Sequence, residues 1–221
     1  MHMMMPGSDI DMRNDLYDLF NKLDSITYNH SIRVMGIARE IEDYFELKSR
    51  TISNAALIHD IGKVFVSSKI LDKVGSLNEI EKTMVNLHPY IGYEILKQYG
   101  IDEDICRLVL YHHGLNPIIL GEIEELQNEK VCDQALMLHS IDAFEALTSD
   151  RPYHRGYLAK EALDIMLREK NHHQAVLDYL IYVTDTDKDY CNSAVFRGYI
   201  GAEYDIAESI IKIILKEGKC A

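Results

Sequence analysis

The chain has 221 residues, a size that predicts one domain with a core large enough to fold without disulfides. Hydrophobic residues make up 47% and charged residues 27%, which is typical of a globular protein and excludes an intrinsically disordered chain. The formal net charge of −13 disfavours binding to partners with a polyanionic surface, because like charges repel. We therefore expect neither a nucleic-acid polymer nor a membrane as partner.

The sequence also predicts a cytoplasmic location. No apolar run approaches the roughly 18 residues of a membrane-spanning helix. The segment Met1–Pro6 lacks the basic region and the long apolar stretch of a signal peptide. The cysteines form no CxxC pair, which excludes a zinc ribbon or a disulfide framework and fits a reducing compartment. They are Cys106, Cys132, Cys191 and Cys220.

Apolar residues recur with helical spacing along almost the whole chain. A first helix, capped by Ser8 or Asp9, is predicted from the apolar face of Leu16, Leu19, Phe20 and Leu23. A second is predicted from about Asn29 to Phe45, with Val34, Ile37, Ile41 and Tyr44 as its buried stripe. A third, near Ser53 to Ile61, is expected to end at Gly62. Further helices are predicted over Leu77–Gly100, Asp102–Tyr111, Cys132–Thr148, Leu158–Lys170, His173–Thr184 and Glu203–Glu217.

The expected fold class is therefore all-α, a helical bundle. Only Lys63–Ile70 has strand-like content, and that segment is too short for a sheet. No repeat or linker divides the chain. We expect one domain over residues 1–170 and a helical extension over 171–221 that packs on it.

Five histidines and two aspartates recur at intervals of about two dozen to thirty residues. Such an interval is roughly one helix and its return connection, so successive helices can each deliver ligands to the bundle interior. Several of these residues follow strongly apolar segments, where a titratable group is costly unless it is paired or bound to metal. Imidazole and carboxylate suit Fe, Mn, Zn or Co. The set is His30, His59, Asp60, His88, His112, His113 and Asp142.

Each of these histidines taken alone would more often be a packed or surface residue than a ligand. The adjacent pairs His59-Asp60 and His112-His113 favour a metal centre for the set as a whole. His139 lies one turn before Asp142 and is either an outer partner of the ligands or a packed side chain.

Three segments carry a resemblance to a known family. His59-Asp60-Ile61-Gly62-Lys63 resembles the signature of HD-domain metalloproteins. The segments from Ile70 to Leu96 and from Ile141 to Tyr153 are similar to the HD-GYP branch of that superfamily. The similarity covers about residues 28–170, and the order of the segments makes it specific.

The resemblance implies an all-α, metal-dependent phosphodiesterase that hydrolyses cyclic di-GMP or a related cyclic dinucleotide. By position, His30, His59, Asp60 and Asp142 would hold one ion, and Asp60 would bridge to a second ion held by His88, His112 and His113. Lys63 would face the scissile phosphate, and Arg151 would contact another part of the nucleotide. For Lys63 and Arg151, a solvated surface position is the alternative.

The chemistry expected of such a centre is hydrolysis by a metal-bridging hydroxide, with Asp60 and Lys63 as catalytic residues. The expected cofactors are two divalent transition metal ions, Fe or Mn first, with Zn, Co or Ni possible.

Two departures from the family pattern bear on the function. The Gly-Tyr-Pro tripeptide is missing, because His112-His113 continues as Gly114-Leu115-Asn116-Pro117. The position four residues before His30, where some members carry a third-metal glutamate, is Ile26, which favours two ions. Two alternatives stay open: a degenerate member that binds a nucleotide or a partner protein without turnover, and a phosphohydrolase for another nucleotide.

Overall fold

The computed structural model describes residues 12–114, 129–150, 155–187 and 203–217, and every secondary-structure element in these ranges is a helix. This confirms the all-α prediction. In chain order the elements are α1 (Met12–Phe20), α2 (Ser25–Tyr44), α3 (Thr51–Ile58), the 3-10 helix η1 (Ile61–Phe65), α4 (Ser68–Leu71), α5 (Glu79–Asn86), α6 (His88–Gln98), α7 (Glu103–Tyr111), α9 (Glu129–Thr148), α10 (Ala159–Glu169), α11 (Gln174–Thr186) and α13 (Glu203–Glu217).

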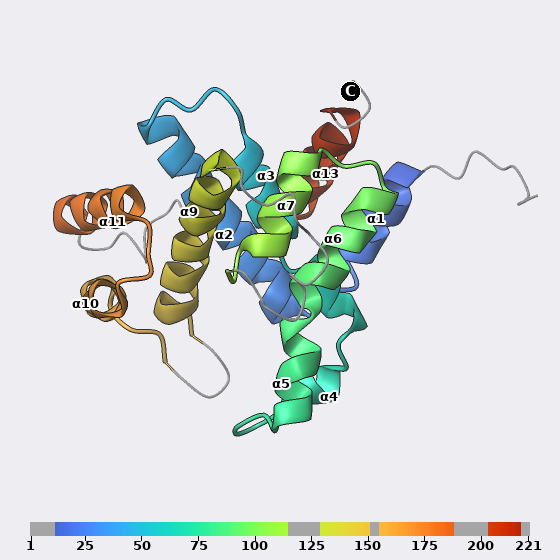
Figure 1. Ribbon diagram of the computed structural model, residues 1–221, viewed down its shortest axis with the longest axis horizontal. Coiled ribbons are helices and arrows are strands. Elements are labelled where there is room, and N and C mark those ends of the chain that lie inside the picture. Colours follow the sequence, from blue (N-terminus) through green and yellow to red (C-terminus); the bar gives the residue numbers. More distant parts are fainter. Residues whose placement is uncertain (1–11, 115–128, 151–154, 188–202, 218–221) are drawn as a thin grey trace, which may run out of the picture.

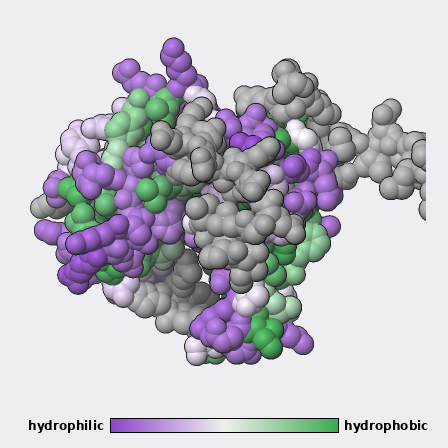
Figure 2. All heavy atoms as spheres, in the orientation of Figure 1, coloured by the Kyte–Doolittle hydropathy of each residue, from purple (hydrophilic) through white to green (hydrophobic). Residues whose placement is uncertain are grey.

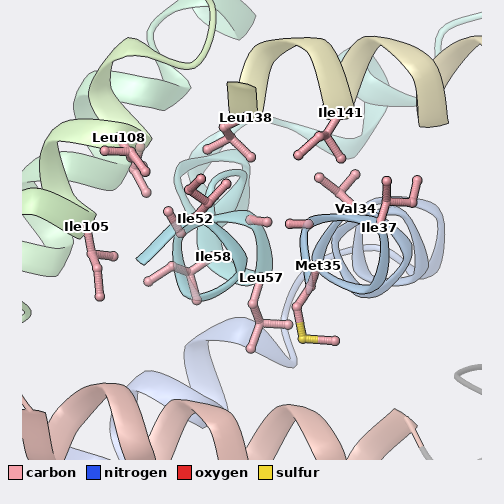
Figure 3. Packing of buried hydrophobic residues seen from close by; sticks show 14 of the residues in the cluster. Val34, Met35, Ile37, Ile52, Leu57, Ile58, Ile105, Leu108, Leu138 and Ile141 are labelled. Atoms are coloured by element: carbon pink, nitrogen blue, oxygen red, sulfur yellow. The ribbon is translucent and has the colours of Figure 1, made fainter. Parts of the chain in front are cut away.

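The core lies between α2, α3, α7 and α9 (Figure 1). Apolar side chains of all four helices pack there, and Figure 3 shows Met35 and Leu57 pointing to the other side of α2 and α3, toward α1 and α13. Burial of apolar surface of this kind is the main favourable term in folding. The residues labelled there are Val34, Met35, Ile37, Ile52, Leu57, Ile58, Ile105, Leu108, Leu138 and Ile141.

The remaining helices surround this core. Helices α10 and α11 pack against α9 on the side away from α7, and α13 packs against α1 and α3 (Figure 1). On the face drawn in Figure 2, hydrophilic residues are interspersed with smaller apolar groups. Among the described residues, no helix combines the length and apolarity that crossing a bilayer requires.

The second helix begins earlier than its apolar pattern indicates. Helix α2 starts at Ser25, because the Asp24 side chain accepts hydrogen bonds from the backbone N–H groups of Ile26 and Thr27 at 3.0 and 2.9 Å. At its other end, Tyr44 is 52% exposed, so its assignment to the buried stripe was wrong. The predicted caps Ser8 and Asp9 lie outside the described residues.

The predicted helix over Leu77–Gly100 is two helices, α5 and α6, which meet at Leu87. Pro89 stands at the start of α6, where a missing N–H costs nothing, and proline there prevents α5 from continuing. Asn78 and Glu81 form a capping box that starts α5. The break places His88 at a helix start.

The third predicted helix is also shorter than expected. Helix α3 ends at Ile58, and the chain continues through His59 and Asp60 into η1. Gly62 lies inside η1 and is not a left-handed helix-ending residue. A Cβ atom there would meet the carbonyl oxygen of His88 at 2.1 Å, so glycine is required for close approach of η1 to α6. The strand-like segment Lys63–Ile70 is η1 followed by the start of α4.

A buried glutamate from α2 caps α3. The Glu42 side chain is fully buried and accepts hydrogen bonds from the backbone N–H groups of Ile52 and Ser53 at 3.0 and 3.1 Å. Burial raises the pKa of Glu42, whereas its contacts with Ser53 and Arg50 favour the charged form. The first turn of α3 thus receives its acceptor from another helix.

Candidate metal centre

Five helical elements bring the seven predicted ligands to one place. His30 comes from the middle of α2, and His59 and Asp60 follow the end of α3. His88 opens α6, and Asp142 lies in α9. His112 and His113 follow the end of α7. Their ligand atoms form three groups, within each of which all atoms lie within 4.8 Å of one another: His88, His112 and His113; His30, His59 and Asp60; His59, His112 and Asp142.

The centre is buried on most sides. His30, His59, Asp60, His88, His112 and Asp142 are all buried residues. The His113 side chain is 46% exposed, so this ring marks the side on which solvent reaches the centre. A site with six buried members and one exposed member can exclude bulk water and still admit a ligand.

Three of the histidines are oriented by carbonyl groups in the last turn of a helix. The Nδ1 atoms of His59, His88 and His112 each lie 2.7 Å from the carbonyl oxygen three residues earlier. Carbonyl groups in the last turn of a helix lie where the regular helical hydrogen-bond pattern ends, so they can accept a hydrogen bond from the ring. With the proton on Nδ1, the Nε2 lone pair of each ring is left for a ligand.

The Nε2 atoms then face acceptors rather than donors. The Nε2 atom of His88 lies 3.1 Å from Oδ1 of Asp60 and 3.3 Å from Nε2 of His112. The buried Nε2 atom of His59 has no hydrogen-bond partner in the described part of the chain. Lone pairs that converge without a proton between them repel, and a buried polar atom without a partner costs about 1–3 kcal/mol. The residues therefore fit divalent metal ions, whose charge removes both penalties.

The charges of His59, His112 and Asp60 agree with that fit. Burial lowers the pKa of His59 and places that of His112 well below its usual range, so both rings are neutral near pH 7. Burial alone would raise the pKa of Asp60, but Lys63 and the neighbouring histidines hold it well below its usual range. Neutral imidazole and ionised carboxylate are the forms that bind metal. His30 differs: burial alone would lower its pKa, but Glu145 and Asp142 raise it to about 10, so an ion bound there would have to displace the Nε2 proton.

Lys63 is held at the centre rather than in solvent. Its Nζ atom lies 2.6 Å from Oδ2 of Asp60, and its side chain is 21% exposed. One turn of η1 separates the two residues, so the contact is local. This arrangement places a positive charge beside the candidate ligands, on the Oδ2 side of Asp60.

Two other predicted residues have different outcomes. The Nδ1 atom of His139 lies 2.9 Å from the backbone carbonyl oxygen of His112, so the His139 ring contacts the main chain of a candidate ligand. Arg151 lies outside the described residues. So do Leu115, Asn116 and Pro117, where the sequence departs from Gly-Tyr-Pro.

The sequence interpretation missed Glu145. Its carboxylate accepts hydrogen bonds from Nδ1 of His30, from Nε of Arg33 and from the hydroxyl group of Ser149. Glu145 lies three residues after Asp142, and Arg33 lies three residues after His30. Because residues three apart share a helix face, this spacing was the available signal.

A family model described as "HD domain" matches residues 27–147. The chain belongs to the HD domain family. The matched segment contains all seven candidate ligands and the Asp60–Lys63 pair.

Among curated proteins, the chain is 33% identical over 152 residues to "Cyclic di-GMP phosphodiesterase PA4108" of Pseudomonas aeruginosa. The aligned segment covers 67% of this chain and 37% of that protein. It is 33% identical over 125 residues to "3'3'-cGAMP-specific phosphodiesterase 3" of Vibrio cholerae. This aligned segment covers 57% of the chain and 26% of that protein. The matched part of this chain thus spans 37% and 26% of the lengths of these two relatives.

Among solved structures, the HD domain of the phosphodiesterase PgpH from L. monocytogenes, in complex with cyclic-di-AMP, matches with a TM-score of 0.57. The match covers 83% of this chain and 99% of that chain at 18% identity. It shows that the two chains share the HD-domain fold.

Proposed function

We propose that this HD-domain protein hydrolyses a phosphodiester bond of a cyclic dinucleotide, cyclic di-GMP or a relative of it, in a metal-dependent reaction. The observation that carries the proposal is the convergence of the seven candidate ligands, in which Nε2 of His88 lies 3.1 Å from Oδ1 of Asp60 and 3.3 Å from Nε2 of His112. Relatives named as cyclic di-GMP and cGAMP phosphodiesterases support the choice of substrate class.

In this proposal His30, His59, Asp60 and Asp142 would hold one metal ion, and Asp60 would also contact a second ion held by His88, His112 and His113. Ions bound there would activate water and stabilise negative charge on the phosphate, and the mixture of imidazole and carboxylate ligands favours Fe or Mn. The chain itself contributes orientation: the rings are fixed through Nδ1, and the buried residues exclude bulk water.

Lys63 and Arg151 are proposed to bind substrate. The Lys63 ammonium group is paired with Asp60, and metal binding at Asp60 would compete for that carboxylate and free Nζ to donate to a phosphate oxygen. Arg151 follows α9, the helix that carries Asp142, and would contact a more distant part of the nucleotide. We further propose that residues 1–170 form the catalytic unit on which the 171–221 extension packs, supported by the contacts of α11 with α9 and of α13 with α1 and α3.

The missing Gly-Tyr-Pro tripeptide is proposed to slow the reaction with cyclic di-GMP. Loss of one aromatic stacking or hydrogen-bonding contact is worth about 1–3 kcal/mol, or roughly 5–150-fold in affinity. We therefore expect turnover of cyclic di-GMP with a kcat/KM below about 10⁶ M⁻¹s⁻¹, or a preference for a related phosphodiester.

A hydrolysis screen tests the function directly. Protein loaded with Mn or Fe(II) is assayed against cyclic di-GMP, cyclic GMP-AMP, cyclic di-AMP, linear dinucleotides and nucleoside phosphates, with metal-free protein as the matched control. We expect slow turnover of at least one cyclic dinucleotide that is abolished when metal is removed. If fully metallated protein hydrolysed none of these phosphodiesters, the binding-only alternative would replace the proposal.

A further inference from the structure

His30 differs from the other oriented histidines in its place along a helix. His59, His88 and His112 stand at helix ends, where each ring contacts a carbonyl oxygen in the last turn of α3, α5 or α7. His30 is the sixth residue of α2, a helix of 20 residues, so the carbonyl groups behind it accept backbone hydrogen bonds of the helix itself. The acceptor for its Nδ1–H must therefore come from another element.

Helix α9 provides that acceptor. Asp142 and Glu145 lie three residues apart on α9 and contact opposite nitrogen atoms of the same ring. The Nε2 atom of His30 lies 2.9 Å from Oδ1 of Asp142, whereas Nδ1 donates to Oε2 of Glu145. One face of α9 thus contributes a candidate metal ligand on one side of the ring and an orienting carboxylate on the other.

The Glu145 carboxylate is itself fully satisfied. Its second oxygen, Oε1, accepts from Nε of Arg33 and from the hydroxyl group of Ser149, and the residue is 1% exposed. A carboxylate at this depth is costly unless it is paired and hydrogen-bonded. Arg33 lies one turn after His30 on α2, so the whole arrangement joins α2 to α9.

We propose that Glu145 is the positioning residue of His30, which fixes the ring so that Nε2 faces the metal centre, and that Arg33 keeps the carboxylate in place. The inference rests on the metal centre of the proposed function and adds a residue that contacts no candidate metal position. Residues in this role affect metal affinity by about 10- to 100-fold.

The substitution Glu145→Gln tests this role with almost no change in volume. His30 and Arg33 donate to different oxygens of Glu145, so a glutamine amide, which has one oxygen and one NH₂ group, would turn its NH₂ group toward one of these two donors. The matched control is Glu42→Gln, because Glu42 is also a buried glutamate that accepts two N–H groups, but it caps α3 and has no contact with a candidate ligand. The measurement is a chelator-competition titration of each variant with Zn(II) alone, accompanied by urea unfolding of the metal-free protein.

We expect Glu145→Gln to weaken one of the two zinc-binding steps by about 10- to 100-fold, while Glu42→Gln retains both zinc affinities and loses only stability. If Glu145→Gln binds both zinc ions as tightly as the wild-type protein, the positioning role is wrong and the metal centre still stands. If the wild-type protein binds no zinc, both the metal centre and this inference are wrong.

A second measurement needs no folded Glu145 variant. In zinc-loaded wild-type protein labelled with ¹⁵N-histidine, long-range ¹H–¹⁵N correlation reports which ring nitrogen carries the proton. His30, assigned through His30→Gln, should carry a proton on Nδ1 that is strongly shifted downfield by its hydrogen bond to a carboxylate. A His30 ring that is protonated on Nε2, or that lacks a hydrogen-bonded Nδ1 proton, would overturn the proposal.

Discussion

Replacing Asp60 by asparagine should release metal from the protein and lower phosphodiesterase activity by more than about 100-fold. This loss exceeds the roughly 10- to 100-fold effect that is typical of substituting a residue that only orients a metal ligand. Asp60 is the candidate ligand shared between the two sides of the centre. Its Oδ1 atom lies 3.1 Å from Nε2 of His88, and its Oδ2 atom lies 3.5 Å from Nε2 of His59. Asparagine keeps the shape of the side chain but removes the charge and presents an N–H₂ group where a lone pair is needed.

The measurement for Asp60→Asn is metal content after purification and dialysis, followed by activity with added Mn. Asp43→Asn is the matched control, because the Asp43 side chain is 65% exposed and contacts Arg50, away from the centre. The control should retain the metal content and activity of the wild-type protein. An Asp60→Asn protein that holds two metal ions would show that Asp60 is not the shared ligand.

Replacing Gly62 by alanine should be the most damaging small substitution in the chain segment around the site. The added Cβ atom would lie 2.1 Å from the carbonyl oxygen of His88 and 2.8 Å from the backbone nitrogen of Gly92. Backbone atoms cannot rotate away, so η1 and the start of α6 must separate. We expect a loss of about 3 kcal/mol in the free energy of unfolding, at the upper end of the usual cost of overpacking, and weaker metal binding because His88 moves away from Asp60.

Gly92→Ala is the control for Gly62→Ala. The Cβ atom in that variant would meet Cγ1 of Val109 at 3.1 Å and Cγ2 of Ile61 at 3.3 Å, both of them side-chain atoms that can shift. We expect a loss of about 1 kcal/mol, near the lower end of the range for overpacking. Urea unfolding measures both variants. Equal destabilisation would mean that close backbone contact between η1 and α6 is not what Gly62 provides.

The sequence by itself determined the helical fold class and which residues converge. The spacing of apolar residues that indicates a helix lies within one short segment, so it can be recognised without knowledge of the rest of the fold. The predicted helices over Glu203–Glu217 and Asp102–Tyr111 accordingly agree with α13 and, to within one residue, with α7. The histidines and aspartates were found because titratable residues beside apolar segments need a reason to be buried. Their spacing and the HD-GYP resemblance together selected them, and the structure places them within reach of one another.

The tertiary structure alone decided what surrounds the ligands and why α3 gives way to η1. Gly62 looked like the end of a helix, but its role is to let a distant backbone segment, at His88, approach η1. The sequence interpretation singled out neither Glu42 nor Glu145, yet Glu42 caps α3 and Glu145 contacts His30 on a neighbouring helix. These contacts join residues as far as 115 positions apart in the sequence. The partner of each residue is therefore near it only after the helices have packed, and the sequence around the residue does not identify that partner.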